Sequence, residues 1–286
     1  SLEKVFPDET PVYRMACQML SGLWGETVSF QVAYTGDFVM RERLDVRVVS
    51  ELAEHVHVRT VEMVPVGRAT NGIVDDNYLK TTSGLYPDLL KELKDGKVIV
   101  YSRQWRSLWV DVDITNEIPA GEYEIELQLV KESEVVCSTK QKVTVVGTEL
   151  PKLDIMHTEW MHADCLADYY HVEVFSEEHW KLLENYFQEY VKRDCNMMLT
   201  PLFTSPLDTA IGLERTTCQL VDVEVKDGQY IFGFENLKRW IDLCKKCGIE
   251  YFEMSHLFSQ WGAKYAPKVV ATVNGKKEKI FGWHTP

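Results

Sequence analysis

The sequence has little positive charge to set against its acidic residues: 31 Lys and Arg stand against 44 Asp and Glu, a formal net charge of −13 at pH 7. It contains no basic run. Because Lys and Arg residues that neutralise phosphates dominate affinity for nucleic acids, this balance argues against a nucleic-acid partner. An acidic surface is compatible with a neutral ligand such as a sugar, but it identifies no ligand by itself.

Long apolar runs and paired cysteines are also missing. No stretch approaches the ~18 consecutive apolar residues of a membrane-spanning helix, so we expect no membrane partner. The seven cysteines show no framework spacing, which predicts free thiols and a cytoplasmic location, although an export signal could have been removed ahead of Ser1. Cys244 and Cys247 form the one Cys-x-x-Cys motif, but they fall in a helical pattern, where packing explains them better than zinc or redox chemistry.

The familiar catalytic signatures are absent as well. The chain has no Gly-x-Ser-x-Gly elbow, no phosphate-binding loop of the Walker type and no Gly-rich dinucleotide fingerprint. Serine hydrolase, kinase and dehydrogenase activities are therefore poorly supported, and we expect no cofactor.

Alternating polarity is what the first half has in abundance. This period of two predicts strands, and no amphipathic helix interrupts them apart from a turn expected at residues 88–93. The strands are expected at residues 28–32, 44–48, 56–66, 108–114, 123–129 and 142–146. The fourth and fifth, joined through Pro119-Ala120-Gly121, are interpreted as a hairpin-like unit. Short strands with regular turn signals predict a β-sandwich over residues 1–148.

The pattern changes at residue 149, where strands begin to alternate with helices. Strands are expected at residues 153–160, 196–202 and 249–254, one helix capped by Ser176, and another ending at Gly248. Hairpin-like insertions are expected at residues 218–232 and 268–280. This order predicts the first units of a (β/α)8 TIM-type barrel over residues 149–286. Three strands cannot close such a barrel, so its open edge predicts self-association unless further chain covers it.

The segment after the first expected barrel strand is dense in groups that bind sugars. It contains His157, Glu159, Trp160, His162, Asp164, Asp168, Tyr169 and Tyr170. Aromatic faces stack on sugar C–H groups, while carboxylates and imidazoles hydrogen-bond to hydroxyls, so we expect this segment to face a carbohydrate substrate. The alternative is that the aromatic residues cap the barrel mouth while the polar groups satisfy buried backbone.

Two further interpretations concern histidines. A metal site would draw on His157, His162, Asp164 and His171, but none of them shows His-x-x-x-His spacing, and we expect no metal. His256 and Trp261 follow the third expected strand and are interpreted as a second wall of the substrate site. A packed histidine beside a core tryptophan explains this pair equally well.

The segment from Trp160 to Trp180, which begins Trp-Met-His-Ala-Asp-Cys-Leu-Ala-Asp-Tyr-Tyr, resembles glycoside hydrolase family 123 and its uncharacterised relatives. The β half, around residues 109–129, is similar to the sandwich that precedes the family's barrel. The resemblance implies hydrolysis of terminal β-N-acetylgalactosaminide or related linkages with retention, in which the substrate's own acetamido oxygen attacks the anomeric carbon. It also implies an adjacent Asp-Glu pair, the Asp polarising the acetamido group and the Glu acting as acid and then base.

The sequence departs from that pattern because its one Asp-Glu dipeptide, Asp8-Glu9, lies in the β half. The resemblance therefore implies that the catalytic pair lies beyond Pro286, and that this chain is the N-terminal portion of a hydrolase, inactive alone. A non-catalytic carbohydrate-binding or scaffold protein is the alternative. On either interpretation, no residue of this sequence is assigned a catalytic role.

Overall fold

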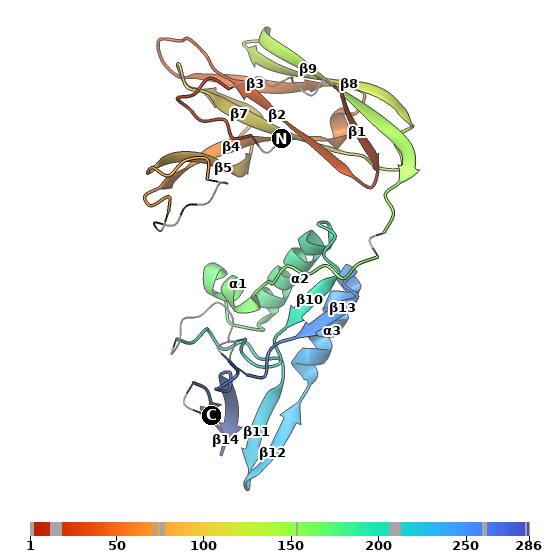
Figure 1. Ribbon diagram of the computed structural model, residues 1–286. Coiled ribbons are helices and arrows are strands. Elements are labelled where there is room, and N and C mark those ends of the chain that lie inside the picture. The colour runs from red at the N-terminus through yellow and green to blue at the C-terminus, as the bar shows by residue number, and fades with distance from the viewer. Residues whose placement is uncertain are drawn as a thin grey trace. The chain divides into compact units, whose positions relative to one another are not determined.

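The computed structural model describes residues 3–11, 19–70, 72, 74, 78–152, 154–205, 213–258, 262–283 and 285. The chain divides into two compact units, Ser1–Lys152 and Leu153–Pro286 (Figure 1). The first unit consists mainly of strands, and the second combines helices with strands. No helix in these ranges is long and apolar enough to cross a membrane.

The first unit contains two sheets that share one hydrophobic core. The five-stranded sheet has the order β1 (Met19–Trp24), β9 (Glu134–Glu149), β8 (Gly121–Lys131), β3 (Glu42–Val49) and β6 (Lys97–Val100). The four-stranded sheet has the order β2 (Thr27–Tyr34), β7 (Arg106–Asp113), β4 (Val56–Val66) and β5 (Gly84–Glu92). Every second residue is buried in the core from Leu108 to Val112 in β7 and from Ile125 to Leu129 in β8. The expected alternation is therefore confirmed in these strands.

Two details of this unit were predicted wrongly. The strands at 108–114 and 123–129 are not paired, because β7 lies between β2 and β4 while β8 lies between β3 and β9. Alternation reveals a buried face but not a neighbour, and both strands bury their faces in the same core from different sheets. Residues 88–92 form the end of β5 rather than a turn. β5 is an edge strand with mostly exposed side chains, so it shows little alternation.

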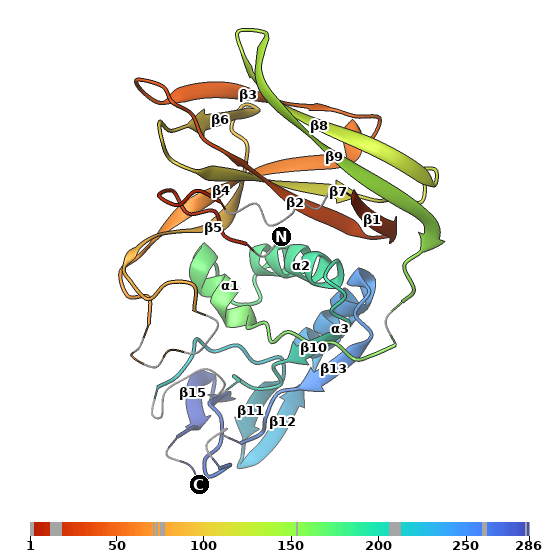
Figure 2. The same cartoon turned by 45° about the horizontal axis from the view of Figure 1, so that its top comes forward.

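The second unit combines helices, a parallel strand pair and a small sheet (Figure 2). Its elements are α1 (Ala163–Tyr170), α2 (Glu177–Val191), β10 (Met197–Thr200), β11 (Asp222–Lys226), β12 (Gln229–Gly233), α3 (Glu235–Cys247), β13 (Tyr251–Met254), β14 (Val269–Val273) and β15 (Lys276–Phe281). β10 and β13 pair in parallel, and the other sheet has the order β12-β11-β14-β15. The parallel pairing of β11 with β14 joins the two expected hairpins into one sheet.

Local sequence chemistry explains where these elements begin and end. The Ser176 hydroxyl accepts a hydrogen bond from the His179 amide at 3.2 Å and so caps α2, as predicted. α3 ends at Gly248, whose φ of 103° lies in the left-handed region. Asn274 and Gly275 both have positive φ between β14 and β15, as a tight hairpin turn requires.

The helices α2 and α3 cover one face of the β10–β13 pair. Phe187 and Trp240 are fully buried between these elements, with their ring centroids 5.0 Å apart. Met198 and Phe252 are paired in register and join the same core. Because side chains alternate along a strand, the next pair in register, Leu199 and Glu253, points to the other side of the strands. Cys244 belongs to this core, with Cys247 packed against it.

The strand expected at residues 153–160 was predicted wrongly for its described part, 154–160, which lies in no strand. The Tyr190 hydroxyl explains this result. It accepts a hydrogen bond from the Glu159 amide at 2.8 Å and lies 3.0 Å from the Glu159 carbonyl and 2.7 Å from the Met197 carbonyl. A side chain thus occupies backbone groups that would otherwise form ladder bonds with β10. The helix α1, in contrast, occupies residues between the first expected strand and the helix capped by Ser176, where no element was expected.

Candidate functional site

Polar side chains gather where the parallel strands β10 and β13 end. Thr200, the last residue of β10, is fully buried, and its carbonyl accepts a hydrogen bond from the Ser255 amide at 2.9 Å. The Ser255 hydroxyl is buried without a hydrogen-bond partner among the described residues. In α/β barrels the functional groups lie at the carboxyl ends of the strands, so this edge is the first place to look for a site.

Trp160 connects this edge to the segment before α1. Its indole Nε1 donates a hydrogen bond to Glu253 Oε2 at 3.0 Å, and its ring meets the His256 ring edge to face, with centroids 6.2 Å apart. Trp160 remains 47% exposed, so much of the indole is available to a ligand. An aromatic ring, a carboxylate and an imidazole therefore lie together, with Glu253 on the side of the strands opposite to Phe252 and the helices. This combination suits a polyhydroxylated ligand.

His157 and Glu159 lie at the start of the second unit and anchor it to β10. The His157 carbonyl accepts hydrogen bonds from the Asn196 and Met197 amides, both at 3.1 Å. The ring Nδ1 lies 3.2 Å from the Asp194 carbonyl, and Nε2 lies 3.5 Å from Glu159 Oε1. These contacts give His157 a structural role, because they hold this segment of the chain against β10. The Glu159 carboxylate is exposed and remains accessible.

Asp164 was predicted to face the ligand, but its side chain is buried. Its carboxylate accepts a 2.8 Å hydrogen bond from Arg215 Nε, and the two side chains are only 8% and 10% exposed. Arg215 also donates to Cys165 Sγ at 2.9 Å. The pair joins α1 to a segment 51 residues later, which sequence spacing could not reveal. His162 immediately precedes α1 and is half-buried.

The tyrosines at the end of α1 form a separate group. Tyr169 and Tyr170 meet edge to face at 4.9 Å, and the Tyr170 hydroxyl lies 3.0 Å from that of Tyr186 on α2. This hydrogen bond is the main reason why the pKa of Tyr186 is raised. The eight residues of α1 span about 12 Å, so these rings lie at the opposite end of the helix from Trp160. The predicted aromatic residues therefore do not converge on one point.

Trp261, the predicted partner of His256, lies outside the described residues, so its place beside the site stays a prediction. Within the described ranges, no group of three His, Cys, Asp or Glu side chains could hold a metal ion. The metal alternative built on His157, His162, Asp164 and His171 thus gains no support there.

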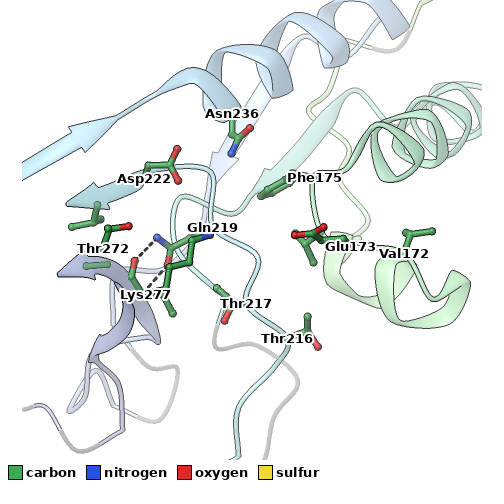
Figure 3. Close-up of a pocket in the computed structure, with 14 residues that line it drawn as sticks. Val172, Glu173, Phe175, Thr216, Thr217, Gln219, Asp222, Asn236, Thr272 and Lys277 are labelled. Atoms are coloured by element: carbon green, nitrogen blue, oxygen red, sulfur yellow. Dashed lines mark hydrogen bonds between the residues drawn. The ribbon is translucent and has the colours of Figure 1, made fainter. Parts of the chain in front are cut away.

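A pocket of about 700 Å³ lies elsewhere in the second unit (Figure 3). The segment between α1 and α2 lines it, together with the start of α3 and the sheet formed by β11, β14 and β15. None of the predicted site residues contributes to its lining.

Sequence reasoning missed two residues that the structure makes prominent. Glu253 was placed inside an expected strand without a role, although alternation with the apolar Phe252 could have assigned it to the face opposite the helices. His179 is fully buried in the first turn of α2, where only its capping contact to Ser176 was foreseeable.

Comparison with known proteins finds a family model that matches most of this unit. Residues 160–285 match the family model of the glycoside hydrolase 123 catalytic domain. A family 123 glycoside hydrolase from Clostridium perfringens, studied for glycolipid glycan hydrolysis, has a similar structure, with a TM-score of 0.68 at 14% identity. The match covers 94% of this chain and 48% of that protein, so this chain spans about half of its length. The resemblance drawn from residues 160–180 is thereby confirmed.

Other matches add little. The N-terminal domain of PorA matches with a TM-score of 0.25 and 10% identity, over 46% of this chain and 88% of that one, which is too distant to carry an argument. No curated protein sequence matches the chain.

Proposed function

We propose, from the match of residues 160–285 to the glycoside hydrolase 123 catalytic domain, that this chain is the substrate-facing N-terminal portion of a glycoside hydrolase. The observation that carries the proposal is the group formed by Trp160, Glu253 and His256 at the carboxyl ends of β10 and β13. Each of these side chains belongs to a residue type that recognises sugars, and the indole is anchored by a hydrogen bond yet half exposed.

The architecture supports this role. We interpret β10 and β13, with α2 and α3 on one face, as the opening part of a TIM-type barrel, and the first unit as a β-sandwich module. On this interpretation Glu253 points toward the interior of the barrel, because Phe252 packs against the helices. Further strands would then supply the rest of the substrate site.

The proposed reaction is hydrolysis of terminal β-N-acetylgalactosaminides, or related linkages, with retention and with the substrate's acetamido group as nucleophile. The Asp-Glu pair that this mechanism needs is assigned to a part of the protein outside this sequence, in keeping with the 48% coverage of the Clostridium perfringens enzyme. The residues of this chain would then bind and orient the sugar. The carbohydrate is the partner we propose, and a reducing cytoplasm is the compartment, since the six described cysteines are free thiols.

The experiment compares the product of the complete gene with this chain on an aryl N-acetyl-β-galactosaminide. We expect turnover by the complete protein and none by this chain. In the complete protein, Trp160→Ala should lower kcat/KM at least tenfold, about 1.4 kcal/mol. Tyr230→Ala, which removes another half-exposed aromatic residue, should leave kcat/KM unchanged. Sugar binding without turnover by the complete protein would instead establish the non-catalytic alternative.

A further inference from the structure

The pocket of about 700 Å³ in the second unit has no role in the function proposed so far. We propose that it is a second sugar subsite, which binds a neutral ring of an extended glycan whose terminal sugar lies at Trp160. The identity of the ligand as a glycan rests on the proposed function, whereas the existence of the subsite rests on the pocket itself.

The pocket has the size and the floor of a ligand site. Its volume falls within the roughly 300–1,000 Å³ of small-molecule pockets. Val223 and Ala271 form part of the lining, and both are buried in a small apolar core beneath the sheet. Gln219 completes the floor by exchanging two 2.9 Å hydrogen bonds with the backbone of Val270, as Figure 3 shows.

The polar groups around this floor have unused hydrogen-bonding capacity. Glu173 lies on one side of the pocket, and Asp222 and Thr272 lie on the other, with Asn236 at the start of α3 (Figure 3). None of these four side chains hydrogen-bonds to another described residue. They offer carboxylate acceptors, an amide that both donates and accepts, and a hydroxyl, which is the mixture that sugar hydroxyls require.

The charges of the lining favour a neutral ligand. The lining contains two carboxylates, Glu173 and Asp222, and one ammonium group, Lys277. A phosphate or sulfate would meet like charge from both carboxylates, whereas sugar hydroxyls can donate to the carboxylates and accept from the lysine. We therefore assign the pocket to a polyhydroxylated ring rather than to an anion.

The pocket wall formed by residues 172–175 is fixed by a hydrogen bond to a buried histidine of α2. Phe175 has a φ of 59°, which is strained for a bulky residue, and its amide donates a 2.9 Å hydrogen bond to Nδ1 of the buried His179. The other ring nitrogen, Nε2, lies 2.9 Å from the Ala163 carbonyl at the start of α1. A preformed wall of this kind lowers the entropy that a ligand loses on binding.

The helix α1 also connects the pocket with the first site. Asp168 on α1 accepts hydrogen bonds of 2.9 and 3.0 Å from the hydroxyl of Thr216, which lines the pocket. Trp160 lies three residues before α1, and the pocket wall begins two residues after it. α1 itself is about 12 Å long, a length that a short oligosaccharide spans.

The test is a calorimetric titration of this chain with two probes: methyl β-N-acetylgalactosaminide and a neutral tetrasaccharide that ends in β-linked N-acetylgalactosamine. We expect the tetrasaccharide to bind the unmodified chain at least tenfold more tightly than the monosaccharide. The double variant Asp222→Ala/Asn236→Ala should abolish this gain and leave the monosaccharide affinity unchanged. Glu278→Ala, which removes an exposed carboxylate from β15 outside the pocket, is the matched control and should keep the gain.

The outcomes separate the two proposals. If both probes bind the unmodified chain equally, or if the double variant keeps the full gain while its thermal unfolding is unchanged, the subsite is refuted. The proposed function survives either result as long as Trp160→Ala weakens monosaccharide binding. If neither probe binds, the subsite is refuted, and turnover of the aryl N-acetyl-β-galactosaminide by the complete protein decides the proposed function. A double variant that fails to fold is replaced by Asp222→Asn and Asn236→Asp, each of which keeps the side-chain shape and should reduce the gain.

Discussion

His179 is predicted to be the residue on which the packing of α1 against α2 depends most. Its ring is fully buried, with Nδ1 accepting from the Phe175 amide and Nε2 donating to the Ala163 carbonyl. This arrangement requires the neutral ring with its proton on Nε2. His179→Ala leaves one donor and one acceptor without a partner at a cost of about 1–3 kcal/mol each. With the packing lost, we expect a total of about 3–5 kcal/mol.

Two variants that each keep one contact refine this prediction. His179→Asn places an oxygen near the position of Nδ1 and should keep the bond to Phe175, whereas His179→Gln places an amide near Nε2 and should keep the bond to Ala163. Each should cost roughly half as much as His179→Ala. Amide hydrogen exchange at Leu183 and Phe187 measures the effect within the second unit alone, since a chain of two units is not expected to unfold in one step. A cost below about 1 kcal/mol for His179→Ala would refute this account.

The same residue predicts a pH dependence with a definite sign. Burial lowers the pKa of His179 and outweighs the opposing effects of the bond to Ala163 and the charge of Asp164. An unfolded chain binds the proton near pH 6.5, while the folded chain does not, so the stability due to His179 is complete above that pH. It is lost as the pH falls through the lower folded pKa, with a slope of at most about 1.4 kcal/mol per pH unit. His179→Asn should lack this slope.

Three further predictions concern the second unit. Arg215→Met should cost about 3–5 kcal/mol because it leaves the buried Asp164 carboxylate unpaired, and Asp164→Asn/Arg215→Met should recover much of that loss in urea denaturation. Ser176→Ala should cost about 1 kcal/mol by removing the α2 cap, and Ser176→Asp should restore it; equal stability of all three proteins would contradict the capping role. Phe187→Ala should cost about 3–5 kcal/mol, whereas the neighbouring, partly exposed Tyr186→Ala should cost much less; similar melting temperatures for the two variants would show that the core is misplaced.

Features set by short stretches of sequence could be predicted, and features set by distant contacts could not. The start of α2 at Ser176, the end of α3 at Gly248 and the turn at Asn274-Gly275 each depend on the chemistry of a few adjacent residues, and all three were expected. The strand expected over 154–160 failed because a hydroxyl from Tyr190, some thirty residues later, occupies its backbone groups. The supposed hairpin of β7 and β8 failed because a shared core does not imply shared hydrogen bonds.

The residues of the candidate site show the same contrast between local sequence and distant contacts. Trp160 and His256 were predicted as ligand-facing residues, and their rings are in contact. Trp160 lies shortly before α1 and His256 lies shortly after β13. Asp164 was grouped with them by sequence proximity, but its partner Arg215 is 51 residues away and buries it. Glu253 was overlooked because its significance depends on which face of β13 the helices cover.

The central claim, that the carboxyl ends of β10 and β13 bind a sugar, is tested most directly by the affinity of this chain for methyl β-N-acetylgalactosaminide, with Trp160→Ala for comparison. The account predicts measurable binding by the unmodified chain and at least a tenfold higher Kd for the variant, about 1.4 kcal/mol. Equal Kd values, or no binding by the unmodified chain, would contradict it.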